Sequence, residues 1–83
     1  MEPKKGSIAI CGIGTLGVIT KDGLQDVEYS DGNKGKAYVG IHLTEKVTQA
    51  GKGWSSRNPI VIGYTDLPVE EFYEKFRDAI TNL

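Results

Sequence analysis

The chain has 83 residues and a formal net charge of −1, with one cysteine, one histidine and one tryptophan. This length limits the chain to one domain with a small core, and a single cysteine excludes an internal disulfide and a cysteine-based zinc site. A net charge near zero does not favour duplex nucleic acid as a partner, because nonspecific duplex binding needs many phosphate contacts. Neither a secretory leader nor a membrane-spanning apolar run is evident, so we expect a cytoplasmic protein without a membrane partner.

Short strands separated by glycine-rich turns are expected from residue 6 to residue 64. The clearest alternation lies in residues 36–44, where every second residue is apolar. The last expected strand begins at Pro59, a position where no ladder amide is needed. The five expected strands are residues 7–11, 16–21, 26–30, 36–44 and 59–64.

The corner between the first two strands has the spacing G-x-G-x-x-G, at residues 12–17. In a dinucleotide-binding unit a helix follows the third glycine. Here the next residues are Val18, Ile19 and Thr20, and β-branched residues favour a strand. We therefore interpret the three glycines as a tight turn between strands.

Residues 67–83 change to a period of three to four, which indicates an amphipathic helix. Pro68 suits its first turn, and Glu70 and Glu71 lie near the positive end of its dipole. The apolar stripe of this helix is expected to pack on the sheet; a dimer contact or a groove-binding helix is the alternative.

The expected fold class is mainly β with one C-terminal helix (α+β), in a single domain of residues 1–83. Five short antiparallel strands leave exposed edges, and closure into a barrel removes them. We therefore expect a small five-stranded antiparallel barrel over residues 6–64 and a helix over residues 67–83.

The best candidate site lies in an expected polar loop, residues 48–58. Glycines there let main-chain amides approach an anion, and the Arg57 guanidinium suits a phosphate. The Trp54 indole offers a face on which a base can stack. In the alternative interpretation Trp54 belongs to the core, and Arg57 pairs with Asp66 or a helix glutamate. The candidate ligand-binding residues of this segment are Lys52, Trp54, Ser55, Ser56, Arg57 and Asn58.

Tyr38 and His42 complete the candidate site. They share the polar face of the strand at residues 36–44, and Gly40 between them leaves a gap above the backbone. Such a face can receive a flat ligand. An ordinary half-exposed strand face, with the two rings as amphipathic cover, is the alternative.

Catalysis has little support in the sequence. It contains no carboxylate pair beside a histidine, no nucleophile elbow and no metal-ligand cluster. Cys11 stands between apolar neighbours, which is typical of a small buried side chain. We expect neither an enzyme nor a bound metal or cofactor.

The strand order, the corner Gly-Ile-Gly-Thr-Leu-Gly-Val-Ile (12–19) and the strand Gly-Lys-Ala-Tyr-Val-Gly-Ile (35–41) resemble the SH3-like small barrels. That group includes KOW, Tudor-like and CAP-Gly-type modules and many short phage or prophage proteins. The resemblance covers residues 6–64, but the Gly-Lys-Asn-Asp-Gly peptide groove of CAP-Gly modules is absent. It implies a non-enzymatic recognition module.

Two functional hypotheses follow. The first is a small phage-type binding protein that captures a phosphate-bearing, nucleotide-like ligand or a short single strand. Sequestering a host signalling nucleotide in this way would counter a defence pathway. The alternative is a protein–protein adaptor or inhibitor that acts through a barrel edge or the C-terminal helix. A homodimer formed through edge strands stays open.

Overall fold

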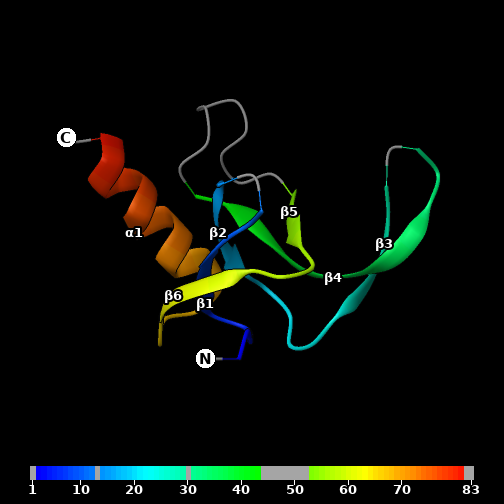
Figure 1. Ribbon diagram of the computed structural model, residues 1–83. Helices are drawn as coiled ribbons and strands as arrows, with labels where there is room; N and C mark the ends of the chain where they lie inside the picture. The colour runs from blue at the N-terminus through cyan, green and yellow to red at the C-terminus, as the bar shows by residue number, and fades with distance from the viewer. Residues whose placement is uncertain (1, 13, 30, 44–52, 82–83) are drawn as a thin grey trace.

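The computed structural model describes residues 2–12, 14–29, 31–43 and 53–81. Within them the chain forms antiparallel strands followed by one C-terminal helix, so the expected mainly β fold with a terminal helix is confirmed (Figure 1). The elements are β1 (Ser7–Ile10), β2 (Leu16–Ile19), β3 (Gln25–Glu28), β4 (Lys34–His42), β5 (Gly53–Ser56), β6 (Ile60–Tyr64) and α1 (Val69–Thr81).

One antiparallel sheet contains all six strands. β1 pairs with β2 on one side and with β6 on the other, and a bulge interrupts the β1–β6 register between Ile8 and Ala9. β4 is the longest strand and pairs with β3 through its first residues and with β2 and β5 through its last. Pairing of β1 with β6 and of β4 with β5 therefore joins the last two strands of the chain to strands from its first half.

Two expectations about the strands are wrong. The polar segment at residues 48–58 was expected to be a loop, but Gly53–Ser56 forms β5 against β4, which gives six strands instead of five. β5 and β6 pair with β4 and β1 and not with each other, so the sheet of the described residues is open where a closed barrel was expected. Burial of Trp54 gives this glycine- and serine-rich segment an apolar anchor, which outweighs its weak strand propensity.

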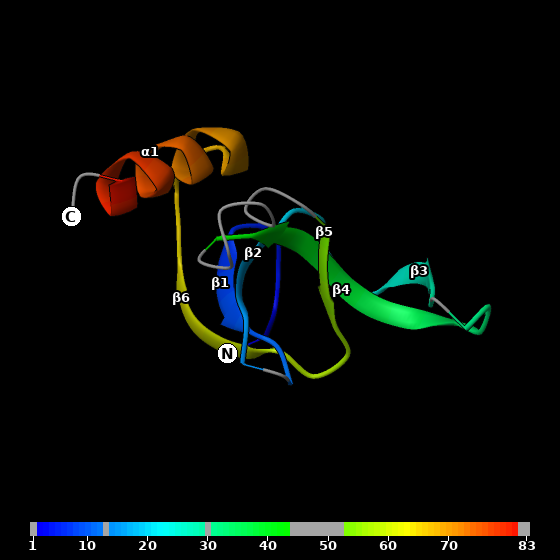
Figure 2. The same ribbon diagram turned by 90° about the horizontal axis from the view of Figure 1, so that it is seen from above.

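The helix covers one face of the sheet (Figure 2). Buried Val69 of α1 packs with Val18 of β2 and with Leu43, and the half-buried rings of α1 surround this cluster. Those rings are Phe72, Tyr73 and Phe76. The apolar stripe of the helix is therefore core packing, as expected from its three-to-four periodicity.

A second cluster lies on the opposite face. Ile19, the neighbour of Val18 in β2, packs there with Ala9, Cys11 and Trp54. Successive side chains of a strand point to opposite faces, so one short strand supplies both clusters. Each of them is small, as expected for a chain of this size.

Two glycines make room for close approaches in the sheet. A Cβ atom at Gly17 would lie 2.6 Å from ring carbons of Trp54, and one at Gly40 would overlap the carbonyl oxygen of Val18. Gly17 therefore belongs to the sheet and packs under an indole, as expected of a structural corner.

The β3–β4 hairpin projects away from the two clusters (Figure 1). Its turn is closed by backbone hydrogen bonds from the Tyr29 amide to the Asn33 carbonyl, 2.8 Å, and from the Gly32 amide to the Tyr29 carbonyl, 2.9 Å. Gly32 has a φ of 85°, which glycine adopts at little cost. The only helix described here is too short and too polar to cross a membrane.

Candidate functional site

The candidate site is built on a contact between Arg57, just after β5, and Tyr29, just after β3. Arg57 Nε donates a hydrogen bond of 2.8 Å to the Tyr29 hydroxyl oxygen. The guanidinium carbon lies 5.0 Å from the centre of the Tyr29 ring, within the range of a cation–π contact. One donor of the guanidinium is thus used to orient it, and Arg57 as a whole is exposed.

Local structure holds the two side chains in this arrangement. The backbone of Tyr29 is fixed by its hydrogen bonds with the backbone of Gly32 and Asn33. Gly35 faces both partners: a Cβ atom there would lie 3.2 Å from the Tyr29 ring and 3.3 Å from Arg57 Nη2. The absence of a side chain at Gly35 therefore lets the tyrosine and the guanidinium lie against β4.

Two shallow hollows share the Tyr29–Arg57 pair. One, of about 440 Å³, reaches toward the hairpin turn, and the other, of about 570 Å³, reaches toward the corner after β1. Both are lined by Ser55 and Ser56, which adds two hydroxyl groups beside the guanidinium. Asn58 contributes to the second hollow. We call Tyr29, Ser55, Ser56, Arg57 and Asn58 the Arg57 cluster.

The positive charge of Arg57 is not paired with a carboxylate in the described part of the chain. Asp31 lines one of the hollows, but both of its carboxylate oxygens accept hydrogen bonds from Asn33, at 3.0 and 2.8 Å. The alternative partners considered from the sequence, Asp66 and the helix glutamates, form no ion pair with Arg57 either; Glu71 instead pairs with Lys75 at 3.6 Å. The Arg57 cluster therefore has the donors and the charge to receive an anion.

Trp54 does not serve as a stacking surface, which corrects the sequence interpretation. Its side chain is 3% exposed and packs with Ala9, Cys11 and Ile19. Its Nε1 donates a hydrogen bond of 3.1 Å to the Thr15 carbonyl. Alternation along β5 explains the outcome, because Trp54 and its exposed neighbour Ser55 point to opposite faces of the strand.

Other candidate residues lie outside the cluster. Tyr38 is half-buried and packs against the Trp54 side of the core. His42 lies at the far end of β4, opposite Gly17, and its buried Nδ1 has no hydrogen-bond partner among the described residues. Neither ring lines the two hollows. Lys52 lies outside the described residues.

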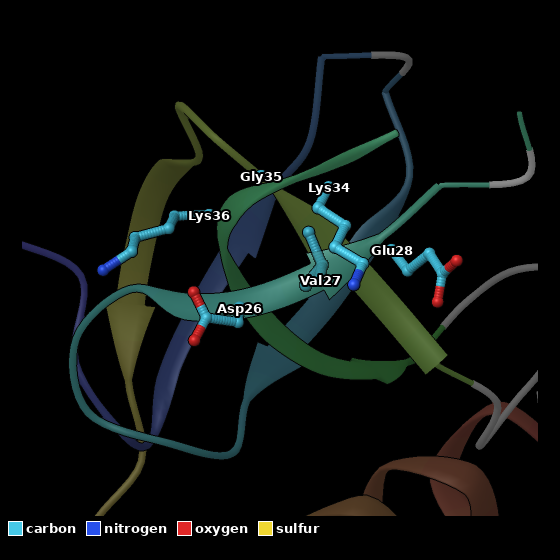
Figure 3. A pocket seen from close by; sticks show the side chains of 6 residues that line it. All are labelled: Asp26, Val27, Glu28, Lys34, Gly35 and Lys36. Carbon is cyan, nitrogen blue, oxygen red and sulfur yellow. The ribbon is translucent and has the colours of Figure 1, made fainter. Parts of the chain in front are cut away.

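A further hollow of about 570 Å³ lies on the β3–β4 hairpin (Figure 3). Asp26 and Glu28 of β3 stand opposite Lys36 and Lys34 of β4. Two carboxylates and two ammonium groups balance in charge, and all four are exposed. This hollow has no net charge and no deep wall, so its ligand chemistry is weaker than that of the Arg57 cluster.

Tyr29 is the member of the cluster that sequence reasoning missed. It lies 28 residues from Arg57 along the chain, and no sequence spacing connects the two. The one signal in the sequence was the position of this aromatic side chain directly before the turn residues Ser-Asp-Gly-Asn at 30–33.

The described residues gather no group of three or more histidine, cysteine, aspartate or glutamate side chains that could hold a metal ion. Comparison of the chain with protein-family models, with curated proteins and with solved structures found no match. The geometry of the chain's own residues is therefore the basis for assigning a function.

Proposed function

We propose that the protein is a non-catalytic binding protein that takes the phosphate of a small nucleotide-like ligand at the Arg57 cluster. The observation that carries the proposal is an exposed guanidinium that is oriented by Tyr29 and has no described carboxylate partner. A planar fork of N–H donors suits phosphate oxygens, and neighbouring serine hydroxyls can share them.

The aromatic partner of the ligand differs from the one expected at first. The Trp54 indole is buried, so any ring of the ligand lies over or beside Tyr29. The hollows are shallow, which suits a small ligand or a short single strand bound from solution better than an enclosed cofactor. Among the described residues that line the two hollows there is no histidine to act as a general base, which supports release of the ligand unchanged.

Titration calorimetry against inorganic phosphate and a panel of mono-, di- and cyclic nucleotides tests the proposal. We expect Arg57→Ala to weaken binding by about tenfold to a hundredfold, the effect of losing a charge-assisted hydrogen bond. Tyr29→Phe keeps the ring and removes the hydroxyl that orients Arg57, so a smaller loss is expected. Arg77→Ala, which removes the same charge from the helix, is the matched control and leaves affinity unchanged.

Two results would contradict the proposal. One is the absence of heat with every ligand of the panel. The other is an equal loss of affinity in Arg57→Ala and Arg77→Ala, since general attraction between charges would then account for binding. Recovery of a chemically altered nucleotide after incubation would contradict the non-catalytic assignment.

We extend this proposal in two ways: the protein is related to the SH3-like small barrels, and its role is of the phage type. The short antiparallel strands that neighbour one another in the order β6-β1-β2-β4-β5 support the kinship, although the sheet of the described residues is open. A protein of this size that binds a nucleotide without changing it would act by sequestration, and a host defence signal is the target that the phage-type resemblance suggests.

A protein–protein adaptor or inhibitor is the second candidate, and one observation favours it. Ile60 and Ile62 of β6 are 65% and 56% exposed, on a strand whose outer side pairs with no described strand. The helix supports this candidate less, because Phe72 and Phe76 pack against the sheet. A protein partner would therefore use the sheet edge.

A further inference from the structure

The two hollows beside Arg57 share part of their lining and then diverge. The shared residues are Tyr29, Ser55, Ser56 and Arg57. Beyond them one hollow continues toward the β3–β4 hairpin and the other toward the corner after β1, and these two segments lie on different sides of β5 (Figures 1 and 2). The guanidinium therefore stands where two hollows meet, and a group bound to it has room on both sides.

Each hollow is large enough to receive its own part of a ligand. Their volumes, about 440 and 570 Å³, both lie within the range of small-molecule sites, about 300–1,000 Å³. A terminal phosphate with one nucleoside would occupy only one of them. A phosphodiester carries a substituent on each side of its phosphorus, so it would occupy both.

The charges of the lining residues favour a phosphate with a single negative charge. Among the described residues that line the two hollows, Arg57 is the only cation and Asp31 the only carboxylate. A phosphomonoester carries about −1.5 to −2 at pH 7, which one guanidinium does not neutralise and which the carboxylate repels. A phosphodiester carries one negative charge, so Arg57 alone neutralises it.

The outer parts of both hollows suit uncharged groups. Toward the corner the wall includes Gly12, where a Cβ atom would have no neighbour within 4 Å, so a flat ring can approach the backbone there. Toward the hairpin, each carboxylate oxygen of Asp31 accepts one hydrogen bond from Asn33 and keeps a second lone pair for a hydroxyl or amino group of a ligand. A nucleoside has both a flat ring and such donors.

We propose, on the basis of the function proposed above, that the ligand of the Arg57 cluster is a dinucleoside phosphodiester. Its phosphate binds Arg57, and one nucleoside lies in each hollow. Tyr29 lines both hollows, so its ring is within reach of either base. One cation between two hollows matches two nucleosides and one linkage, and a longer strand gains little more from this site.

Titration calorimetry with matched ligands tests the proposal. The ligands are a dinucleoside monophosphate, the corresponding nucleoside monophosphate and the methyl ester of that monophosphate, each with adenine and with uracil as the base. The methyl ester has the single charge of a diester but only one nucleoside. With at least one base, the dinucleoside should bind at least about tenfold more tightly than either mononucleotide, which is the gain from a second base contact. A trinucleotide should bind within about threefold of the dinucleoside, because it adds only a second register.

Gly12→Leu tests whether the hollow toward the corner is occupied. Gly12 lines only that hollow, and a side chain there meets no atom within 4 Å, so the variant should keep the circular dichroism and urea unfolding of the wild type. We expect its affinity for the dinucleoside to fall at least about fivefold and its affinity for the mononucleotide to change by less than about twofold, because a single nucleoside can use the other hollow. Gly63→Leu, the same change at an equally open glycine of β6, is the matched control.

The outcomes separate this inference from the function on which it rests. Equal affinity for the dinucleoside and the methyl ester would overturn the assignment of two nucleosides, and so would an equal loss in Gly12→Leu and Gly63→Leu. The proposed function would then still stand if Arg57→Ala weakens binding. A trinucleotide that binds tenfold more tightly than the dinucleoside would overturn the inference in favour of a single strand. Absence of binding by every ligand would overturn the proposed function and this inference together.

Discussion

At the scale of single residues, Trp54 and Arg57 stand three positions apart and have opposite surroundings. The Trp54 indole is enclosed by the smaller core cluster, and its one N–H donates to the Thr15 carbonyl. Arg57 is exposed and contacts Tyr29 through a hydrogen bond and a cation–π interaction. Stability and ligand binding should therefore separate when these two residues are changed.

Trp54→Phe is expected to lower the free energy of unfolding by about 1–3 kcal/mol, because a smaller ring replaces the buried indole and the Thr15 carbonyl keeps only the Cys11 amide as its donor. Urea unfolding followed by circular dichroism measures this loss. Nucleotide affinity should stay within about twofold of the wild type, since the indole lies away from both hollows. A large loss of affinity with unchanged stability would restore the stacking role that the burial of Trp54 argues against.

At the scale of elements, the helix and the sheet depend on each other. Nearly half of the residues of α1 are acidic or basic, and its described apolar contacts with the sheet are made through Val69 and three half-buried rings. A thirteen-residue helix is marginal alone in water, so packing stabilises it more than its intrinsic propensity does. Without the helix, Val18 and Leu43 would be open to solvent.

Phe72→Ala should therefore lower the free energy of unfolding by about 2–4 kcal/mol, since it removes apolar contacts with both Phe76 and the sheet. Glu74→Ala, on the exposed side of the same helix, is the matched control and should change stability by less than about 0.5 kcal/mol. Chemical denaturation measures both variants. Equal effects would mean that the helix is docked loosely and contributes little to the fold.

At the scale of the whole molecule, stability is unevenly distributed. The chain spans 39 × 27 × 19 Å, with the helix-covered sheet in one part and the β3–β4 hairpin extending from it (Figures 1 and 2). β2 has three successive buried residues, whereas β3 has none. The hairpin also contributes Tyr29 to the Arg57 cluster, so the candidate site lies at the junction of the two parts.

Native-state hydrogen exchange should show this division. Amide protons of β2 are expected to exchange about a hundredfold more slowly than those of β3, because opening the hairpin exposes little apolar surface. A saturating ligand at Arg57 should slow exchange in β3 and leave exchange in β2 unchanged, because the hydrogen bond between Arg57 and Tyr29 connects the hairpin to the site. Uniform protection across both strands would show that the hairpin opens only with global unfolding.

Several structural features could be predicted from short-range patterns in the sequence. The alternation at residues 36–44 identified most of β4, and the three-to-four spacing after Pro68 identified α1 and its packing side. Both patterns depend on residues that lie within one helical turn or one strand pleat of each other, so they can be recognised from the sequence alone. The sequence also predicted correctly that a strand and not a helix follows the corner, but Gly17 lies within β2 and not in the turn between the strands.

The remaining features depend on contacts between distant segments. Whether Trp54 faces ligand or core follows from the pairing of β5 with β4, and the Arg57 cluster exists only because the β3 hairpin brings Tyr29 beside β5. The open edge of β6 likewise follows from which strand pairs with β1. Burial and partnership of a side chain are properties of the assembled sheet, because residues far apart in sequence supply the surface that covers it.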